Sequence, residues 1–233
     1  MSISPANLAD VDWITARLAE RREALRPLAP VFWRPAPNAA ERHRQFIKYL
    51  LTDGGGLAYR TADSVLLATP RGDGWLVDDL HVRDQYWTTD GVDLWNALAA
   101  DRRAEVVRFV CPTYENDRAE FASNIGLTVA ETWWLIELES GGGETHVTIS
   151  LPGADAVTVG APPVYAPPGP MLFLASPEDV ATAVPAALDK APGMGCAGVV
   201  VNQAASEQSM AEVLRAAGLR PHCDFFVGTI EEA

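Results

Sequence analysis

Three adjacent residues near the end of the chain, His222, Cys223 and Asp224, have the side chains of a nucleophilic triad. They lie in a run typical of a β-strand, where successive side chains point to opposite faces. Neighbours in a strand cannot bring an acid, a base and a nucleophile together, so we exclude triad chemistry here. The sequence also has no CxxC or HExxH pattern, which argues against a metal centre.

The charge balance limits the partners of the protein. The formal net charge is −13 at pH 7, and binding to nucleic acid or anionic lipid needs clustered basic side chains, so we expect neither partner. No apolar run reaches the roughly eighteen residues that span a bilayer, and the first residues do not resemble a signal peptide. The three cysteines fit reduced thiols. These features together predict a cytoplasmic protein.

The first half of the chain predicts alternating helices and strands. Apolar spacing and turn residues place them as follows: a strand at 2–4, a helix at 10–26 with Asp10 as N-cap, a helix at 38–52, strands at 57–60, 64–69 and 75–82, a helix at 89–102, a strand at 105–111, a helix at 114–124 and a strand at 127–138.

The second half is similar to part of the first. A flexible break at Ser140–Gly143 predicts a boundary between domains 1–139 and 140–233. Two short strands, at 145–151 and 156–159, are expected after it. A shift of 92 positions then pairs Gly126 with Gly218 and aligns the order strand, helix, strand, helix, Gly-Leu, strand. We interpret the second half as a shorter, degenerate copy; a chance match of two α/β units is the alternative.

Two segments of the first half carry a family resemblance. The run Val77–Val82 and the run Asn116–Ala119, followed by Phe121 and Gly126-Leu127, together with the element order, resemble the GNAT acetyltransferase superfamily. The resemblance implies an α/β fold of the α+β type, with a mixed, mostly antiparallel central sheet flanked by helices. The second half would be a half-length GNAT-like repeat.

The resemblance implies acetyl-CoA (coenzyme A) as cofactor. In the family the fourth strand splays from the fifth and offers backbone groups to the pantetheine arm, while a glycine-rich loop and helix N–H groups hold the pyrophosphate. The cofactor-binding residues expected on this basis are Leu80, His81, Val82, Arg83, Thr88, Thr89, Gly91, Val92 and Asn116.

The loop here departs from the family pattern. Thr89 stands where a glycine is expected, and Asp90 is expected to cap the helix, which places a carboxylate where phosphate would sit. Arg83 can supply compensating positive charge. In the second copy, Ser176 is expected to cap the corresponding helix, so we interpret that copy as structural.

The resemblance also implies catalytic and acceptor-binding residues. Asp79 is the candidate base, with a pKa raised by burial, or else an ordinary carboxylate at a strand end. Ser123 falls near the position of the tyrosine that protonates the leaving thiolate in the family, or is an exposed helix serine. Trp33 and Arg34 lie where the family binds the acceptor, or are packing residues of a proline-rich loop.

The leading hypothesis is an N-acetyltransferase that moves acetyl from acetyl-CoA to an amine of a small molecule or peptide, in a cleft between Leu80–Val82 and Arg108–Cys111. The eroded loop and missing tyrosine motivate an alternative, a catalytically inactive GNAT-like binding or regulatory module. A third reading is a structural protein that forms a homodimer through the aromatic strand Thr132–Leu138.

Overall fold

The computed structural model describes residues 3–233, so Ser2 of the first expected strand lies outside the described residues. The chain forms two compact units. Unit 1 comprises the residues up to Leu25, Ala40–Ala130 and Phe225–Ala233, and unit 2 comprises Arg26–Ala39 and Glu131–Asp224. Strands β7 and β12 contribute to both. Both units are discontinuous in sequence, whereas the predicted domains 1–139 and 140–233 are continuous, and that division of the chain stays a prediction.

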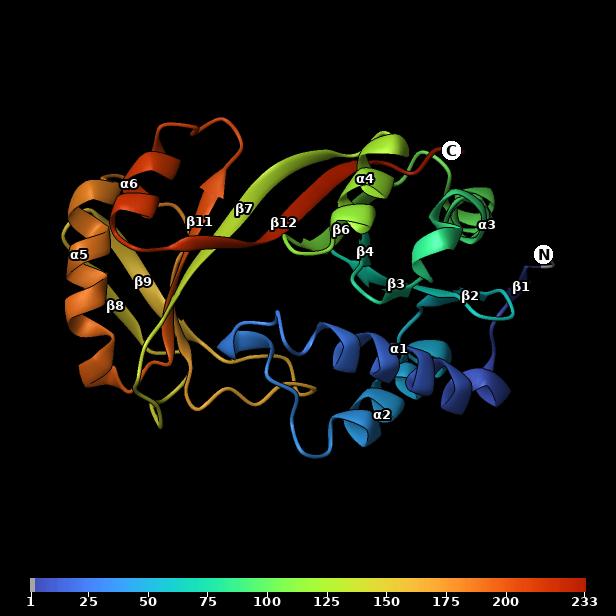
Figure 1. The fold of residues 1–233 in the computed structure, drawn as a ribbon, viewed down its shortest axis with the longest axis horizontal. Coiled ribbons are helices and arrows are strands. Elements are labelled where there is room, and N and C mark those ends of the chain that lie inside the picture. The colour runs from blue at the N-terminus through green and yellow to red at the C-terminus, as the bar shows by residue number, and fades with distance from the viewer. Residues whose placement is uncertain (1–2) are drawn as a thin grey trace. The chain divides into compact units, whose positions relative to one another are not determined.

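The strands of unit 1 form a mixed sheet. Its order is β1-β2-β3-β4-β6-β12, and β5 pairs with β3 (Figure 1). The pairs β1–β2, β2–β3, β3–β4 and β3–β5 are antiparallel, and β4 pairs with β6 in parallel. The bounds are β1 Ser4–Pro5, β2 Leu57–Arg60, β3 Val65–Arg71, β4 Gly74–Val77, β5 Leu80–His81, β6 Val106–Pro112 and β12 Arg220–Thr229.

Helices cover both faces of this sheet (Figure 1). Strand β3 shows why: Val65 and Leu67 pack in one cluster with α1 and α2, while the alternate residues Leu66 and Ala68 pack in a second cluster with α3 and α4. The helices are α1 Val11–Leu25, α2 Ala39–Thr52, α3 Val92–Arg102 and α4 Asn116–Asn124. No helix in the described part of the chain is long and apolar enough to cross a membrane.

The predicted cap of the first helix is wrong by one turn. A 3₁₀ turn, η1 (Leu8–Asp10), precedes α1, and Asn7 caps it by accepting the Ala9 N–H at 2.9 Å. In the reciprocal hydrogen bond, the Asp10 carboxylate accepts the backbone N–H of Asn7 at 3.0 Å. The two residues therefore form a capping box in which Asp10 is the third helical position.

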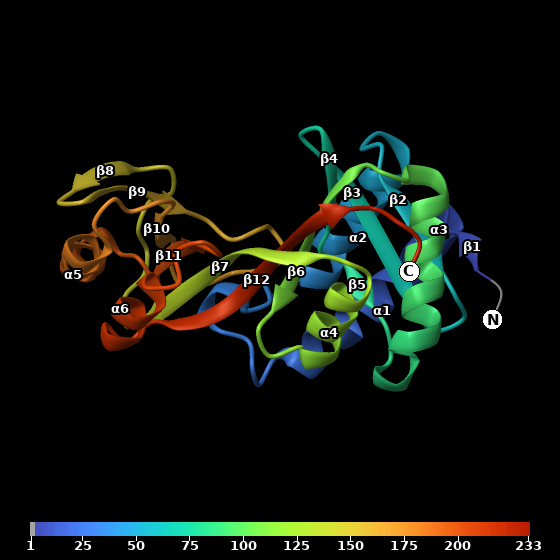
Figure 2. The same ribbon diagram turned by 90° about the horizontal axis from the view of Figure 1, so that it is seen from above.

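Unit 2 has strand order β12-β7-β11-β10-β9-β8. One face is covered by α5 and α6, and the other by the segment Arg26–Ala39, which contains the 3₁₀ turn η2 (Val31–Trp33) (Figure 2). The bounds are β7 Thr128–Glu137, β8 Thr148–Leu151, β9 Ala154–Val159, β10 Met171–Leu174, α5 Val180–Lys190, β11 Gly198–Ala204 and α6 Met210–Ala216.

The helix α5 is capped, but not by the expected residue. Asp179 accepts the N–H groups of Ala181 and Thr182 at 3.1 and 3.2 Å. The hydroxyl of Ser176 instead donates to the carbonyl of Ala175 at 2.7 Å. The expectation that this helix caps itself holds, with a different residue in the role.

The shift of 92 positions has a structural counterpart. Strands β7 and β12 differ by 92 at both ends. Gly126 and Gly218 both adopt left-handed backbone, with φ of +84° and +88°, a conformation that favours glycine. The next residues, Leu127 and Leu219, each donate their N–H to the carbonyl five positions earlier at 3.0 Å. The two halves therefore share the same local structure at equivalent positions, and the predicted α/β fold with a mixed central sheet and flanking helices is observed.

His222 lies in an aromatic cluster of unit 2 and takes no part in a triad. It is 5% exposed, and its ring centroid is 6.3 Å from those of both Trp33 and Trp133. Its Nδ1 lies 2.9 Å from the Trp133 carbonyl oxygen, so Nδ1–H donates. Asp224 accepts from the hydroxyl of Thr132 instead. Burial lowers the pKa of His222 to about 4.

Stability should therefore fall in mild acid. The unfolded chain protonates His222 near pH 6.5, whereas the folded chain does so only near a pKa of about 4. The contribution of the neutral His222 side chain to the free energy of unfolding is complete above the pKa of the unfolded chain. This contribution, about 3 kcal/mol in all, is lost as the pH falls toward the pKa of the folded chain. Urea denaturation across this pH range checks it. His222→Phe should flatten the profile and the exposed-site control His146→Asn should not; an unchanged slope in His222→Phe contradicts the account.

Candidate functional site

The expected strand 75–82 is broken in the structure. Its first part, β4, pairs with β6 as far as Val77, opposite Phe109. Its second part, β5, pairs with β3. Between them one residue is inserted, because Leu66 to Thr69 on β3 spans three steps and Leu76 to Leu80 spans four. The bulge lets β5 separate from β6, as the family resemblance implies.

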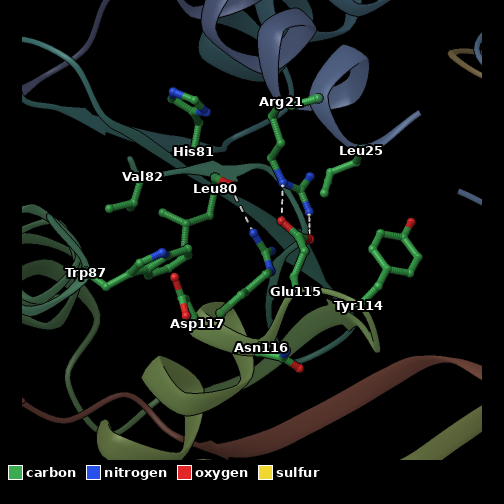
Figure 3. A pocket seen from close by; sticks show the side chains of 12 residues that line it. Arg21, Leu25, Leu80, His81, Val82, Trp87, Tyr114, Glu115, Asn116 and Asp117 are labelled. Carbon is green, nitrogen blue, oxygen red and sulfur yellow. Dashed lines mark hydrogen bonds and ion pairs between the residues drawn. The ribbon is translucent and has the colours of Figure 1, made fainter. Parts of the chain in front are cut away.

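Arg118 from α4 fills this separation. Its Nε donates to the carbonyl of Val110 at 2.8 Å, its Nη1 to Leu80 at 3.0 Å and its Nη2 to Asp78 at 2.8 Å (Figure 3 shows the bond to Leu80). The residue is 0% exposed, and its guanidinium lies 4.6 Å from the Phe109 ring centroid. Burial lowers the pKa of Arg118, but a guanidinium stays protonated. A buried cation therefore bridges the two strands.

A cavity of about 330 Å³, here called the β5–α4 pocket, lies beside this bridge. Its walls come from α1, β5, the start of the helical segment η4 (Trp87–Gly91) and the start of α4 (Figure 3). Arg21 of α1 and Glu115 form a two-bond ion pair across it, with Nε to Oε1 at 3.0 Å. Burial tends to raise the pKa of Glu115, but the charges of Arg21 and Arg118 have the larger effect, and the pKa is lowered overall.

Asp79, the predicted base, is held by other side chains. His43 Nε2 lies 2.8 Å from its Oδ2, and Arg22 Nη1 lies 2.5 Å from His43 Nδ1. Because arginine only donates, Nδ1 accepts and Nε2–H donates to Asp79. Burial tends to raise the pKa of Asp79, but His43 and nearby arginines lower it overall. The expected rise in pKa is therefore wrong, and Asp79 is not among the residues lining the pocket.

Ser123, the other predicted catalytic residue, lies on the exposed side of α4. Its hydroxyl donates to the Ala119 carbonyl at 3.0 Å, one turn earlier in the same helix. It lines neither the β5–α4 pocket nor the neighbouring cavity described below. Its geometry is that of an ordinary helix serine.

The expected phosphate loop is helical. A 3₁₀ turn, η3 (Asp84–Tyr86), leads through η4 into α3, so α3 has no separate amino terminus. Gly91 has φ −61° and ψ −50°, and a Cβ at this position would lie 3.3 Å from the Phe121 ring. A side chain at this position would press against Phe121, so close packing against α4 favours glycine. The N–H groups at the start of α3 belong to a continuous helical segment.

Asp90 does not cap the helix, and that prediction is wrong. Its carboxylate is 1% exposed and accepts the hydroxyls of Thr61 at 2.7 Å and Ser64 at 2.8 Å. These residues precede β3, so the carboxylate fastens the helical segment to the meander. A buried acid in this position disfavours a bound phosphate.

The remaining predicted cofactor residues separate into three groups. Leu80, His81, Val82 and Asn116 line the β5–α4 pocket. Thr88 and Val92 line a second cavity of about 320 Å³, here called the η4–α4 cavity. Arg83 pairs with Asp63 at 3.4 Å, and Thr89 is exposed.

The two predicted acceptor-binding residues belong to unit 2. Trp33 packs edge-on against Phe32 and Tyr165, with ring centroids 4.7 and 5.0 Å apart. Arg34 lines a cavity of unit 2 together with Arg26. The packing alternative for Trp33 matches this geometry.

Several residues of the site were not singled out from the sequence: Arg21, Trp87, Glu115, Asp117 and Arg118. For one of them, Arg118, the sequence contains a feature that could have identified it. Arg118 lies three and four positions before Phe121 and Ala122, on the apolar face of its helix. A charged residue on an apolar face predicts either burial with partners or a functional site.

Comparison with known proteins shows the fold. No family model matches the sequence, and no curated protein does either. A candidate acetyltransferase from Thermoplasma acidophilum is 11% identical, with TM-score 0.60 over 98% of this chain and 100% of its own. A tandem GNAT protein from the clavulanic acid biosynthesis pathway is 14% identical, with TM-score 0.51 over 100% and 99%.

A third solved structure is similar over the whole chain. A GCN5-related N-acetyltransferase from Sphaerobacter thermophilus is 11% identical, with TM-score 0.53 over 99% of this chain and 96% of its own. At these identities the likeness concerns the fold. The chain therefore has the fold of the GNAT acetyltransferases, as the sequence predicted.

Replacing Arg118 should destabilise unit 1. Arg118→Met removes the donor from three carbonyls at once and should lower the free energy of unfolding by at least about 3 kcal/mol, because each loses a bond to a charged group. Equilibrium urea denaturation measures the change. The control Arg103→Met alters an arginine whose side chain is 65% exposed and should change little; a loss below about 1 kcal/mol for Arg118→Met contradicts the bridge.

Proposed function

We propose that this chain is a GNAT-fold binding module that does not transfer acetyl groups. The observation that carries the proposal is the position of Arg118 between β5 and β6. In the family, backbone groups exposed by this separation receive the pantetheine arm of acetyl-CoA. Here the carbonyls of Leu80 and Val110 each already accept a bond from a buried guanidinium, so a charged side chain occupies the space between the strands.

The helical segment before α3 also supports the proposal. Coenzyme A is a polyanion, so its pyrophosphate needs free N–H groups and positive potential. At this position the protein has continuous helix and the buried carboxylate of Asp90. Arg83, the residue expected to compensate, is paired with Asp63. These residues therefore do not fit the cofactor.

The acid–base chemistry points the same way. A base for amine deprotonation works best with a pKa near the working pH. The pKa of Asp79 is instead lowered, and its carboxylate is bonded to His43. Ser123 donates within its own helix. Neither residue is placed to serve a reaction in the β5–α4 pocket.

An N-acetyltransferase acting on a small-molecule or peptide amine is the second candidate. It is favoured by one observation, the cavity of about 330 Å³ beside the strand and helix that carry the family resemblance. Acetyl-CoA would have to displace Arg118 from its three carbonyls to use the separation between the strands.

Acetyl-CoA at millimolar concentration should leave the melting temperature of the full chain unchanged and give no calorimetric binding signal. A ligand that bound the native state would stabilise it and raise the melting temperature. In parallel, release of free thiol from acetyl-CoA with a panel of primary amines should equal the rate without protein. Asp79→Ala is the matched control. Acetyl transfer to any amine above the rate without protein would establish the second candidate and refute the first, and its loss in Asp79→Ala would show that this carboxylate takes part.

A further inference from the structure

Strand β8 is the outermost strand of unit 2, and only one side of its backbone is paired. It runs antiparallel to β9, from Thr148 opposite Val157 to Leu151 opposite Ala154. Within residues 3–233, no strand pairs with its other side (Figure 2). Strand β7, the expected dimer interface, lies between β12 and β11 and is paired on both sides. Strand β8 is therefore the edge at which unit 2 can accept a further strand.

The hydrogen bonds of the β8–β9 hairpin direct two residues outward. Leu151 and Ala154 flank the two-residue turn Pro152-Gly153, so they form a hydrogen-bonded pair. Hydrogen-bonded and non-hydrogen-bonded pairs alternate along an antiparallel ladder. Thr148 and Ser150 therefore belong to non-hydrogen-bonded pairs, and their backbone N–H and C=O groups point away from β9. Both residues are exposed.

This edge lacks the features that commonly prevent strand addition. Short length, charged side chains and proline protect the edge strands of monomeric sheets. Strand β1, the edge strand of unit 1, has two of these features, because it is two residues long and one of them is Pro5. Strand β8 reads Thr-Ile-Ser-Leu and contains neither a charge nor a proline. In a protein of net charge −13, an open and uncharged edge indicates a site for another strand.

The helix beside this edge is uncharged as well. Helix α5 carries no charged side chain from Val180 to Leu188. Its N-cap residue, Asp179, donates its backbone N–H to the carbonyl of Gly153 in the β8–β9 turn at 3.2 Å, which fixes the start of the helix to the hairpin. Ala181 and Pro185, one helical turn apart, are exposed. Strand β8 and helix α5 therefore form one uncharged end of unit 2.

We infer that unit 2 binds a second copy of this chain by pairing β8 with β8 of that copy, antiparallel about a two-fold axis beside Ile149. This register places Thr148 opposite Ser150 of the second copy, so the outward backbone groups of the two residues bond to each other. The edge is thus complementary to itself, as a two-fold interface requires. Ile149 lies opposite its own copy, on the face that packs against the core cluster containing α5.

The helices must contribute to the interface together with the strands. A ladder of two four-residue strands is only about 13 Å long, whereas a stable interface buries about 1,200 Å² or more. The α5 helices of the two copies lie on the same face of the joined sheet, and their exposed side chains at Ala181 and Pro185 have no charge to desolvate. The inference goes beyond the proposed function, because it does not depend on whether the chain transfers acetyl groups.

Sedimentation equilibrium of the full chain tests the association. The mean mass should rise from monomer to dimer between about 1 μM and about 500 μM, with a dissociation constant of about 10 μM or below. Added salt should tighten the dimer, because it screens the repulsion between two negatively charged chains. A monomer at every concentration overturns the inference.

Hydrogen exchange places the interface on the chain. The backbone N–H groups of Thr148 and Ser150 should exchange about tenfold or more slowly in the concentrated sample than in the dilute one, because they become ladder donors only in the dimer. A dimer in which the exchange of these two amides is unchanged overturns the inference.

Matched variants separate the edge from the overall charge of the protein. The double variant Thr148→Lys/Ser150→Lys sets like charges opposite each other across the two-fold axis and should weaken the dimer about tenfold or more. It also makes the protein less negative, so an effect of overall charge has the opposite sign. The control Thr128→Lys/Ala130→Lys adds the same charge to two exposed residues of β7 and should change the dissociation constant less than about twofold.

Urea denaturation checks that both double variants fold. Equal dissociation constants for the β8 variant and the unmodified chain overturn the inference.

Discussion

Arg118 is a charged side chain with no access to solvent, and its guanidinium is satisfied by backbone carbonyls of the two strands that the bulge pulls apart. Bonds to a buried charge are stronger than neutral ones and leave large penalties when broken. Three features of the site depend on this contact. It fixes α4 against β6, it bridges β5, which pairs with β3, to the separated strand β6, and it supplies part of the wall of the β5–α4 pocket.

The charges around this contact explain why the chain keeps the fold while the site does not favour binding of coenzyme A. In a protein with net charge −13, binding a polyanion requires concentrated positive charge. The arginines of the site are instead engaged internally: Arg21 with Glu115, Arg22 with His43, and Arg118 with carbonyls. The buried carboxylate of Asp90 ties the segment before α3 to the hydroxyls of Thr61 and Ser64. The positive charges of these arginines therefore stabilise the fold and are not available to bind a polyanion.

The fold could be predicted from the sequence because its signals are local. Alternating apolar residues fixed the strands to within a few positions, and the paired Gly126 and Gly218 marked equivalent left-handed turns in the two copies. The site depends on contacts between distant residues. Asp90 followed every local rule for a helix cap, yet its partners lie 29 and 26 positions away. Arg118 finds its acceptors 8 to 40 positions away, which helical periodicity alone cannot reveal.

The central claim is that a buried guanidinium closes the separation between β5 and β6. The most direct measurement is hydrogen exchange of the Arg118 side-chain Nε–H by ¹⁵N-edited NMR, with and without acetyl-CoA. The bond from this group to the Val110 carbonyl predicts strong protection from exchange and a resonance that acetyl-CoA does not shift. Rapid exchange in the free protein, or a shift of this resonance together with those of Leu80 and Val110 on adding acetyl-CoA, would contradict the account.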